Sequence, residues 1–533
     1  MIHYLLLGGL VIMVSTVMSK FSQRYNIPSL LLFVGLGMVL GVNGIFHIEF
    51  SNFQISQDIA TFCLIFIMFY GGFGISWAKA KPIALQAGLL SSLGIVLTTF
   101  FMGVFAHFVL GFTWLEAFLM GAVMSSTDAA SVFNILRMRQ LNLKGGIASL
   151  LEMESGSNDP FAYMLTIIIL GLMSGSDQSI GLLLISQLAF GAGFGLLVGR
   201  LGVWMIQHIQ FKESSIKAIF VAMIAVLAFA FPTVLQGNGF LSAYIAGVII
   251  GNAQLKHKKD LVLFFDAITQ MMQIILFFML GLLSDPMDMP RVFLPALAIF
   301  AFLTLVSRPL SVWLTLKPFK EAWNVVGFLS AGGLRGAASI VFSMMTVVSS
   351  AHLDHDIFHI VFIVALLSII IQGSSLTWAA HTFDVIDEDN DVRLTFNDYI
   401  DQMPIELTSF QVDEESHWVN QEIKDIHFPS PSLVVGIDRE DHFFLPQGGT
   451  RVQAGDQLII SSPSYRGDDL YLDEVLVGED HPWKGLKLFQ IETKDVLLIA
   501  MIKRKDWILI PDGNTQILEN DTLVLCKLED KLI

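Results

Sequence analysis

Residues 154–160 read ESGSNDP and interrupt an apolar run that is otherwise long enough to cross a membrane. The run is LLEM at 150–153 before this stretch and FAYMLTIIILGLM at 161–173 after it. A charge near the centre of a bilayer costs about 3 kcal/mol on insertion scales, so ionisable residues at that depth are rare and mark functional sites. The stretch therefore predicts a membrane-spanning helix with a polar site near its middle.

The composition is that of a membrane protein with a separate acidic tail. Of the 533 residues, 54% are hydrophobic and 15% are charged, whereas soluble domains carry about 25% charged residues. Residues 1–383 hold 18 basic and 16 acidic residues, a net charge of +2, and residues 384–533 hold 13 and 31, a net charge of −18. The charge of the tail disfavours binding to nucleic acid or to anionic lipid.

Thirteen segments are apolar over about the 20 residues that a spanning helix needs. They are residues 2–19, 27–45, 56–76, 83–110, 113–136, 146–174, 179–207, 215–232, 238–252, 265–283, 291–316, 322–348 and 357–380.

Basic residues in the loops predict the orientation. Every second loop is basic, and these loops together hold 14 lysines and arginines, whereas the intervening loops hold only Arg291. Cytoplasmic loops carry the excess of basic residues, so we expect the chain to start outside the cell and the tail to be cytoplasmic. The 14 residues are Lys20, Arg24, Lys79, Lys81, Arg137, Arg139, Lys144, Lys212, Lys217, Lys256, Lys258, Lys259, Lys317 and Lys320.

Two segments are broken by polar residues or glycines: SSTDAASVF (125–133) in the fifth and SAGGLRGAAS (330–339) in the twelfth. An odd number of spans suits two inverted six-helix repeats around a linking helix, which puts these two segments at corresponding positions. Transporters of this design bind ions near the midplane, where paired helices are interrupted. The predicted fold is a polytopic α-helical membrane protein of about thirteen spans, with two interrupted helices and an α/β tail.

Four ionisable residues are expected near mid-membrane: Asp128, Glu154, Asp159 and Arg335. Glu154 and Asp159 are five residues apart and point about 140° apart on a helix. An unpaired buried charge is costly, so we expect Glu154 to pair with Arg335, which leaves Asp159 free to titrate.

A free Asp159 carboxylate can hold a proton or a small cation, and this competition alone makes an exchanger. Asn158 adds an amide but no second charge, so the exchange is expected to be electroneutral. Oxygen ligands from Asp159, Asp128, the Ser155 hydroxyl and a carbonyl near Thr127 suit a hard cation. Two plainer interpretations stay open: Asp159 bonds a neighbouring helix, and Asp128 caps a half-helix.

Three motifs together resemble the NhaP-type branch of the monovalent cation:proton antiporters: SSTDAASVF, then ESGSNDPFA, then GLRGA in the twelfth segment. The likeness is closest to bacterial potassium/proton antiporters with a cytoplasmic regulatory tail. It implies that Asp159, beside Asn158, is the shared proton and cation site and that Ser155 helps to coordinate the cation. Thr127 and Asp128 would lie where their helix is unwound.

The resemblance also implies a Glu154–Arg335 ion pair and a homodimer, formed through the membrane domain and the tail, that works by an elevator-like movement in a bacterial inner membrane. One position departs from the pattern. Similar proteins carry an acidic residue before a Gly-Gly in the third segment, where this chain has Tyr70 in FYGG. The cation preference, potassium or sodium, therefore stays open.

The acidic tail repeats itself. Residues 433–461 align with residues 497–526 at an offset of 65, so that Arg439 matches Arg504 and Asp456 matches Asp521. Each copy is predicted to form short strands joined by turns. The copies resemble the C-terminal lobe of the domains that regulate potassium conductance (RCK-C or TrkA-C), which implies a small regulatory ligand such as a nucleotide. A dimerisation module is the alternative.

The predicted boundaries are 1–383 for the transmembrane domain, 384–404 for an acidic linker, 405–484 for the regulatory domain, and 485–533 for a shorter, divergent second copy. On the outer side, AHLDHDIFH (351–359) brings together His352, His355 and His359. The i,i+4 spacing of the last two suits a metal, but we expect a solvated helix start and no bound metal or cofactor.

These patterns predict an electroneutral secondary antiporter, not an enzyme, that exchanges cytoplasmic K⁺ or Na⁺ for external H⁺ under control of its tail. The alternatives are a Na⁺/H⁺ antiporter of the same fold, a passive channel gated by the tail, and a solute:sodium symporter. The channel alternative predicts flux that does not depend on Asp159.

Overall fold

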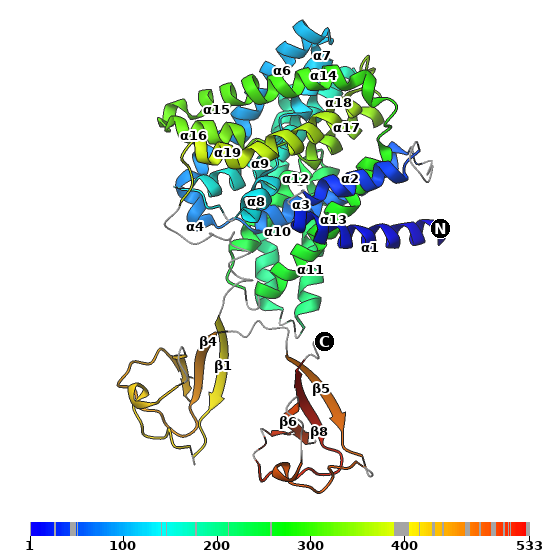
Figure 1. Cartoon of the computed structure of the whole chain (residues 1–533). Coiled ribbons are helices and arrows are strands. Elements are labelled where there is room, and N and C mark those ends of the chain that lie inside the picture. Colours follow the sequence, from blue (N-terminus) through cyan, green and yellow to red (C-terminus); the bar gives the residue numbers. More distant parts are fainter. Residues whose placement is uncertain are drawn as a thin grey trace. The chain divides into compact units, whose positions relative to one another are not determined.

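The computed structural model forms two compact units, Met1–Gln402 and Met403–Ile533 (Figure 1). It describes residues 2–25, 28–42, 50, 52–139, 141–144, 146–175, 179–209, 211, 213–255, 258–387, 405–414, 416–428, 432–439, 442–463, 470–478, 481–491, 497–504, 507–509, 511 and 513–528.

The first unit is helical. Its α-helices are α1 (Ile2–Tyr25), α2 (Ser29–Leu40), α3 (Phe53–Phe73), α4 (Trp77–Ala80), α5 (Ala84–Leu89), α6 (Ile95–Leu110), α7 (Trp114–Val123), α8 (Ala129–Met138), α9 (Ile147–Met173), α10 (Ile180–His208), α11 (Ser214–Val234), α12 (Gly239–Asn252), α13 (Lys258–Leu283), α14 (Met289–Phe302), α15 (Arg308–Leu316), α16 (Trp323–Ala331), α17 (Ala337–Val348), α18 (Ile357–Leu367) and α19 (Gly373–Thr382). Short π segments, η2 (Leu90–Gly94), η3 (Leu303–Ser307) and η5 (Ser368–Gln372), and 3-10 turns, η1 (Lys81–Ile83) and η4 (Lys317–Phe319), continue some of these helices.

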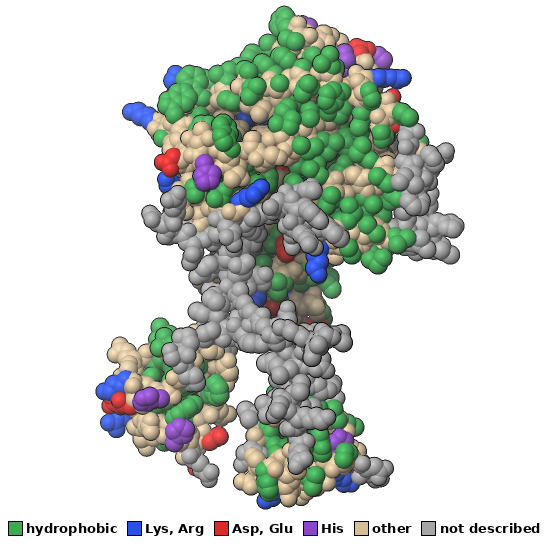
Figure 2. Space-filling view, viewed as in Figure 1, with side chains coloured by type: hydrophobic (Ala, Val, Ile, Leu, Met, Phe, Trp, Pro, Cys, Tyr) green, Lys and Arg blue, Asp and Glu red, His purple; other side chains and the backbone are tan. Residues whose placement is uncertain are grey.

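In the part of the chain that the structure describes, each of the thirteen predicted segments contains helix. Seven continuous helical runs are long and apolar enough to cross a membrane: Phe53–Phe73, Trp77–Leu110, Ile180–His208, Ser214–Val234, Lys258–Leu283, Met289–Phe319 and Ile357–Thr382. Hydrophobic side chains cover a broad surface of this unit (Figure 2), among them Leu294 and Leu305. A surface of this kind belongs in lipid, so the first unit is a helical membrane domain.

Both predicted interruptions are present. The α7 helix ends at Val123 and α8 begins at Ala129, while α16 ends at Ala331 and α17 begins at Ala337. The two breaks meet, because the Asp128 N–H donates to the Leu334 carbonyl at 2.8 Å. Irregular backbone at membrane depth persists only where protein or a cavity surrounds it, and here each break supplies partners for the other.

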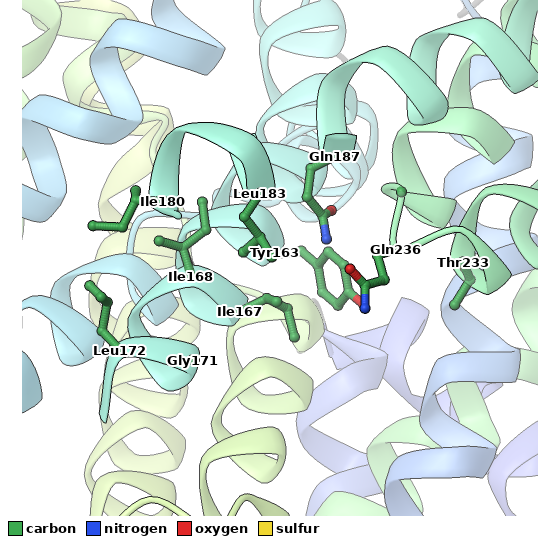
Figure 3. A pocket seen from close by; sticks show the side chains of 11 residues that line it. Tyr163, Ile167, Ile168, Gly171, Leu172, Ile180, Leu183, Gln187, Thr233 and Gln236 are labelled. Atoms are coloured by element: carbon green, nitrogen blue, oxygen red, sulfur yellow. The ribbon is translucent and has the colours of Figure 1, made fainter. Parts of the chain in front are cut away.

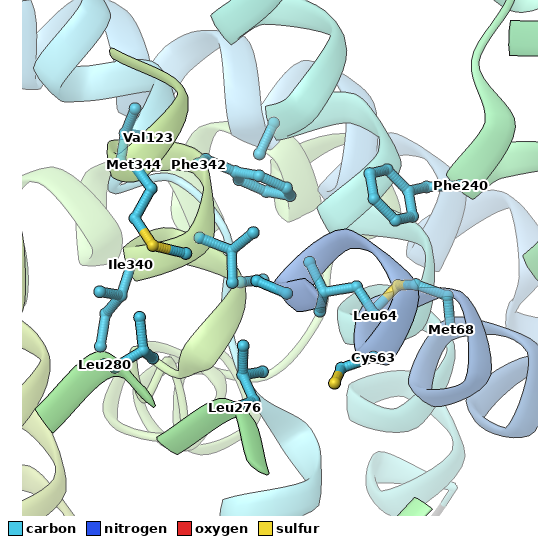
Figure 4. Close-up of a cluster of buried hydrophobic side chains, with 14 of the residues drawn as sticks. Cys63, Leu64, Met68, Val123, Phe240, Leu276, Leu280, Ile340, Phe342 and Met344 are labelled. Atoms are coloured by element: carbon cyan, nitrogen blue, oxygen red, sulfur yellow. The ribbon is translucent and has the colours of Figure 1, made fainter. Parts of the chain in front are cut away.

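The core joins helices from both ends of the domain. Side chains of α3, α7, α12, α13 and α17 pack in one buried cluster (Figure 4). Between α3 and α12 the backbones approach closely, because any side chain at Gly247 would collide with the Phe69 carbonyl oxygen. Small residues at such crossings allow close helix packing in membranes. This packing fixes α12, which faces the site helix α9, against α3.

The second unit contains two antiparallel sheets of the same topology. The first has strand order β1-β4-β2-β3, with β1 (Ile405–Gln411), β2 (Leu433–Arg439), β3 (His442–Phe444) and β4 (Gln457–Pro463). The second has order β5-β8-β6-β7, with β5 (Leu470–Leu476), β6 (Leu497–Arg504), β7 (Trp507–Leu509) and β8 (Thr522–Leu528).

These sheets correct two predictions for the tail. The second copy starts at β5 rather than at residue 485, because residues 470–476 pair with β8 just as residues 405–411 pair with β4. It is therefore a complete second copy with the same 65-residue offset. Its described residues and those of the first copy form strands and 3-10 turns, η6 (Ile423–Asp425) and η7 (Leu488–Gln490), so the tail is β-rich rather than α/β.

The start of the predicted linker is packed against the membrane domain. Residues 384–387 turn back and pair with residues 142–144, the connection between α8 and α9. The Lys144 N–H donates to the Val385 carbonyl at 2.8 Å, and the Asp387 N–H donates to the Asn142 carbonyl at 3.0 Å. Val385 is fully buried. The rest of the predicted linker, residues 388–404, lies outside the described residues.

Candidate functional site

The site helix is α9, and it buries the Asn-Asp pair of ESGSNDP. Asn158 is fully buried and Asp159 is 7% exposed. Pro160 follows within the helix and has no N–H, so the Gly156 carbonyl loses its usual i+4 donor. The Ser126 hydroxyl, from the break after α7, donates to Asp159 Oδ1. The sequence thus brings a buried carboxylate against a broken helix.

Side chains of α9 and of the first break bond to one another. The Asn158 Nδ2 donates to the Thr127 hydroxyl, and the Ser155 hydroxyl donates to the Thr127 carbonyl at 2.7 Å. Ser155 Oγ also accepts from the Ala129 N–H at 2.8 Å, so it connects the two sides of the break. Among the described residues, Asn158 Oδ1 has no hydrogen-bond partner. That oxygen lies on the residue next to the Asp159 carboxylate, whose Oδ1 accepts from Ser126.

Asp128 caps the second half of the broken helix. Its Oδ2 accepts from the Ser131 hydroxyl at 2.6 Å and its Oδ1 accepts from the Ser131 N–H at 3.2 Å, which is the bonding of an N-cap. A side chain at Gly336, just before α17, would collide with this same carboxylate. Asp128 therefore lies at the positive ends of α8 and α17, and the predicted capping role is confirmed.

The predicted Glu154–Arg335 pair is wrong. Glu154 lies instead beside Arg308, with 2.6 Å between Oε1 and Nη1, and both side chains are buried. The contact is an ion pair by distance, but it lacks the angles of a hydrogen bond. Sequence reasoning put Arg308 near the end of a span, whereas it follows the π segment η3 in the interior of the run Met289–Phe319.

Arg335 bonds the end of α7. Its Nη1 donates to the carbonyl oxygens of Ser125 and Ser126 at 2.8 and 2.7 Å, and its N–H donates to the Ser368 hydroxyl. Backbone carbonyl groups in an interrupted segment lack the partners that a helix supplies. The Arg335 guanidinium and the Asp128 carboxylate therefore both stabilise the first break.

Two residues of the facing helix were missed in the sequence. The Asn238 Nδ2, at the start of α12, donates to the Pro160 carbonyl at 2.7 Å. The Tyr244 ring packs so closely on Gly156 that a side chain there would collide with it. These contacts lie on both sides of Asp159 in the sequence. No local pattern indicates them, because their partners are about 80 residues away.

The remaining predicted residues lie in separate places. Tyr70, on α3, stacks on Phe73 and Phe265 with ring centroids 6.4 and 6.3 Å away. In the outer segment, His355 bonds the buried Glu116, while His359 bonds Asp356. The two histidines therefore face different carboxylates, and no metal-binding group of three or more such side chains occurs among the described residues.

The ionised carboxylates and guanidinium groups at the site add up to a net charge of −1. Asp128, Glu154 and Asp159 supply three carboxylates, and Arg308 and Arg335 supply two guanidinium groups. Glu154 has Arg308, and Asp128 has two helix N-termini. Among the described residues, Asp159 bonds a neutral donor, the Ser126 hydroxyl. One proton or one monovalent cation on Asp159 neutralises this set.

Comparison with known proteins shows the family of the chain. The family described as "Sodium/hydrogen exchanger, transmembrane" matches residues 9–382, and the TrkA-C domain matches residues 407–470. The chain is 31% identical over 462 residues to "K(+)/H(+) antiporter NhaP" of Alkalimonas amylolytica, covering 86% of this chain and 80% of that protein. It is 32% identical over 472 residues to "K(+)/H(+) antiporter NhaP2" of Shewanella oneidensis, with the same coverage.

The fold is also similar to a solved structure. The sodium proton antiporter MjNhaP1 from Methanocaldococcus jannaschii, at pH 8, superposes with a TM-score of 0.64 at 21% identity. The superposition covers 72% of this chain and 99% of that one. The likeness therefore extends over the helical membrane domain and shows a shared fold.

Proposed function

Because this chain belongs to the sodium/hydrogen exchanger family and is a cation/proton antiporter, we propose that it exchanges cytoplasmic K⁺ for external H⁺ at Asp159. The observation that carries the proposal is the position of Asp159. It is buried beside the unwound backbone of the first break, and the two nearby guanidinium groups bond other partners.

Competition at this carboxylate couples the two ions. A protonated Asp159 has no charge to attract a cation, and a cation on Asp159 displaces the proton. The ligands for the cation are the Asp159 carboxylate and Asn158 Oδ1, with Thr127, Asp128 and Ser155 holding the break in place. One charge in each direction per cycle makes the exchange electroneutral.

Potassium is the proposed cation because both relatives described above are named K⁺/H⁺ antiporters. A Na⁺/H⁺ antiporter of the same fold is the second candidate, and the name of the structural neighbour favours it. Tyr70 stands where the family resemblance implies an acidic residue, and its ring stacks on Phe73 and Phe265 rather than at the ion site, so it favours neither cation.

We place the domain in a bacterial inner membrane as thirteen spans in two inverted six-helix repeats, with the chain starting outside and the tail in the cytoplasm. The alternation of basic loops supports this orientation. A homodimer formed through the membrane domain and the tail, with α9 moving against α12, completes the proposal. The Asn238–Pro160 hydrogen bond and the Tyr244–Gly156 contact are among the contacts that such a movement would break.

The tail is proposed to regulate exchange through residues 384–387, the strap. The strap pairs with the connection between α8, which begins beside Asp128, and α9, which carries Asp159. Two backbone hydrogen bonds of about 1 kcal/mol each hold it, which is comparable to the 1–3 kcal/mol of a typical allosteric coupling. A small ligand such as a nucleotide on the TrkA-C-like copies would act by this route.

The test is proton movement in proteoliposomes after addition of K⁺, Na⁺ or Li⁺, with and without a clamped membrane potential. We expect K⁺ to collapse a pH gradient in the wild type and not in Asp159→Asn, with no effect of the clamp. Asp58→Asn is the matched control, since Asp58 is exposed at the start of α3. Flux that persists in Asp159→Asn, or that follows the potential, would replace the antiporter by a channel.

A further inference from the structure

A cavity of about 320 Å³ lies between α9, the start of α10 and the turn after α11 (Figure 3). Its lining residues on α9 begin at Tyr163 and follow Asp159 and Pro160 in the chain. Its walls are apolar side chains such as Ile167, Leu183 and Ile168, and none of its described lining residues carries a charge. The polar groups are few, and Figure 3 shows Gln187, Gln236 and Tyr163 pointing toward one another. The cavity is mainly apolar with a small polar end, as ligand pockets are.

Gln187 is the side chain that indicates a ligand. It is 5% exposed, it points into the cavity, and its Oε1 has no hydrogen-bond partner among the described residues. A buried amide oxygen without a partner costs about 1–3 kcal/mol. A hydroxyl group at this place can donate to the Gln187 oxygen and accept from its N–H. The amide therefore suits a neutral group that both donates and accepts.

The exposed lining residues of the cavity are both polar and apolar. Thr233 and Gln236 are exposed polar lining residues. Leu172 and Ile180 are exposed apolar ones, and Leu182, beside them on α10, is 66% exposed. These side chains belong to helices that lie in the membrane domain. An occupant therefore arrives from the bilayer with an apolar body.

We propose that this cavity binds an uncharged amphiphile from the bilayer, with its hydroxyl on Gln187 and its chain between α9 and α10. The described lining residues include no cationic side chain that would bind a lipid phosphate. The apolar walls exclude a free sugar or ion. The site is separate from the ion site.

Binding there is expected to slow exchange, an effect that rests on the proposed movement of α9. Tyr163 lies one helical turn after Asp159, and the Gln187 carbonyl accepts from the Asn238 N–H at 3.2 Å. Asn238 in turn bonds Pro160 of α9. The apolar chain of an amphiphile bound between α9 and α10 therefore hinders the proposed movement of α9 against α12.

The test uses the full chain in lipid nanodiscs, a photoreactive diazirine derivative of octanol, the matching diazirine alkane, and mass spectrometry of the labelled peptides. We expect the alcohol to label residues of α9 and α10 that line the cavity, about fivefold more than the alkane does, the ratio that one hydrogen bond of about 1 kcal/mol gives. Gln187→Leu should remove this preference and keep the labelling by the alkane. Leu183→Trp, which fills the cavity, should remove both.

Leu182→Trp is the control, because it faces outward from the same turn of α10. The proposed site is wrong if Leu183→Trp leaves the labelling unchanged, or if alcohol and alkane label the wild type equally. The cavity then holds water or nonspecifically bound lipid. Labelling does not depend on transport. If the label follows the expected pattern while K⁺ drives no proton movement, the cavity is a binding site and the proposed exchange is wrong.

Discussion

Arg308 lies 2.6 Å from Glu154 in the interior of the membrane domain, and this pair releases Arg335 to bond the Ser125 and Ser126 carbonyl groups in the break after α7. Two buried cations thus have different tasks: one neutralises a carboxylate of the site helix, and the other stabilises an interrupted helix. Neither guanidinium group is bonded to Asp159 among the described contacts, as the proposed exchange of one cation for one proton at this carboxylate requires.

Removing Arg308 should lower the stability of the protein, because it leaves a buried carboxylate unpaired. Arg308→Met leaves Glu154 charged and unpaired, which is expected to cost about 3–5 kcal/mol and to lower the melting temperature of the purified protein strongly. Glu154→Gln in the same chain should restore most of the loss. Arg291→Met, an exposed residue, is the control. Equal melting of the single and double variants would contradict the pair.

Arg335→Met should behave differently. It removes the two bonds to the Ser125 and Ser126 carbonyl oxygens, each worth about 1.5–3 kcal/mol because the donor is charged. The melting temperature should fall, and Glu154→Gln should not restore it, since Glu154 has Arg308. Restoration by Glu154→Gln would mean that the predicted Glu154–Arg335 pair forms after all.

Asn238→Ala should weaken the contact between α9 and α12. The Pro160 carbonyl and the Leu241 N–H each lose a partner, so the expected cost is about 1–3 kcal/mol, read as a lower melting temperature. Asn324→Ala is the control, because the Asn324 side chain bonds only the neighbouring Val325 N–H. A melting temperature equal to that of the control would show that this bond contributes nothing.

Releasing the strap should act like removing the tail. Val385→Asp puts a charge at a buried position, and deletion of residues 405–533 removes both sheets. We expect each change to shift the pH profile of exchange by the same amount. The two changes combined should shift it no further than either one alone. Lys144→Met removes the exposed contact with Asp384 and keeps the backbone pairing of the strap, so it should leave the profile unchanged. A shift from the deletion alone would show that the tail acts by another route.

The repeated Arg–Asp pairs should make the tail sensitive to acid. Burial would raise the pKa of Asp456, but hydrogen bonds from Arg439 and from the Gln453 N–H outweigh it and hold the pKa below its ordinary value. The Arg504–Asp521 pair repeats this arrangement. A depressed pKa adds stability above the ordinary value of about 4 and loses it as the pH falls through the lowered value.

Acid unfolding of fragment 403–533 measures this effect. We expect its stability to be constant at neutral pH and to fall below about pH 4. Arg439→Met should cost about 3 kcal/mol at pH 7 and flatten the acid dependence. Arg451→Met, which removes an exposed contact with Glu422, should do neither. An acid dependence that Arg439→Met leaves unchanged would exclude this pair as its source.

The sequence alone was sufficient for what depends on local signals. Apolar length marks the helical segments, and glycines and polar residues within them mark the two breaks at 124–128 and 332–336, since such residues disrupt a helix wherever it packs. The Asn158–Asp159 pair is also evident, because carboxylates are rare at membrane depth. The tail repeat follows from matched residues at a fixed offset.

Tertiary structure alone decided which groups meet. In a folded chain Glu154 can pair with either Arg308 or Arg335. Which of the two it contacts depends on how α15 packs beside α9. The strap, the Asn238–Pro160 bond and the place of β5 in the second sheet join residues tens to hundreds of positions apart. Sequence periodicity reports the face and length of one element, while these contacts depend on how separate elements cross. The predicted partner of Glu154 was therefore wrong, although each residue of the pair was correctly placed in the interior.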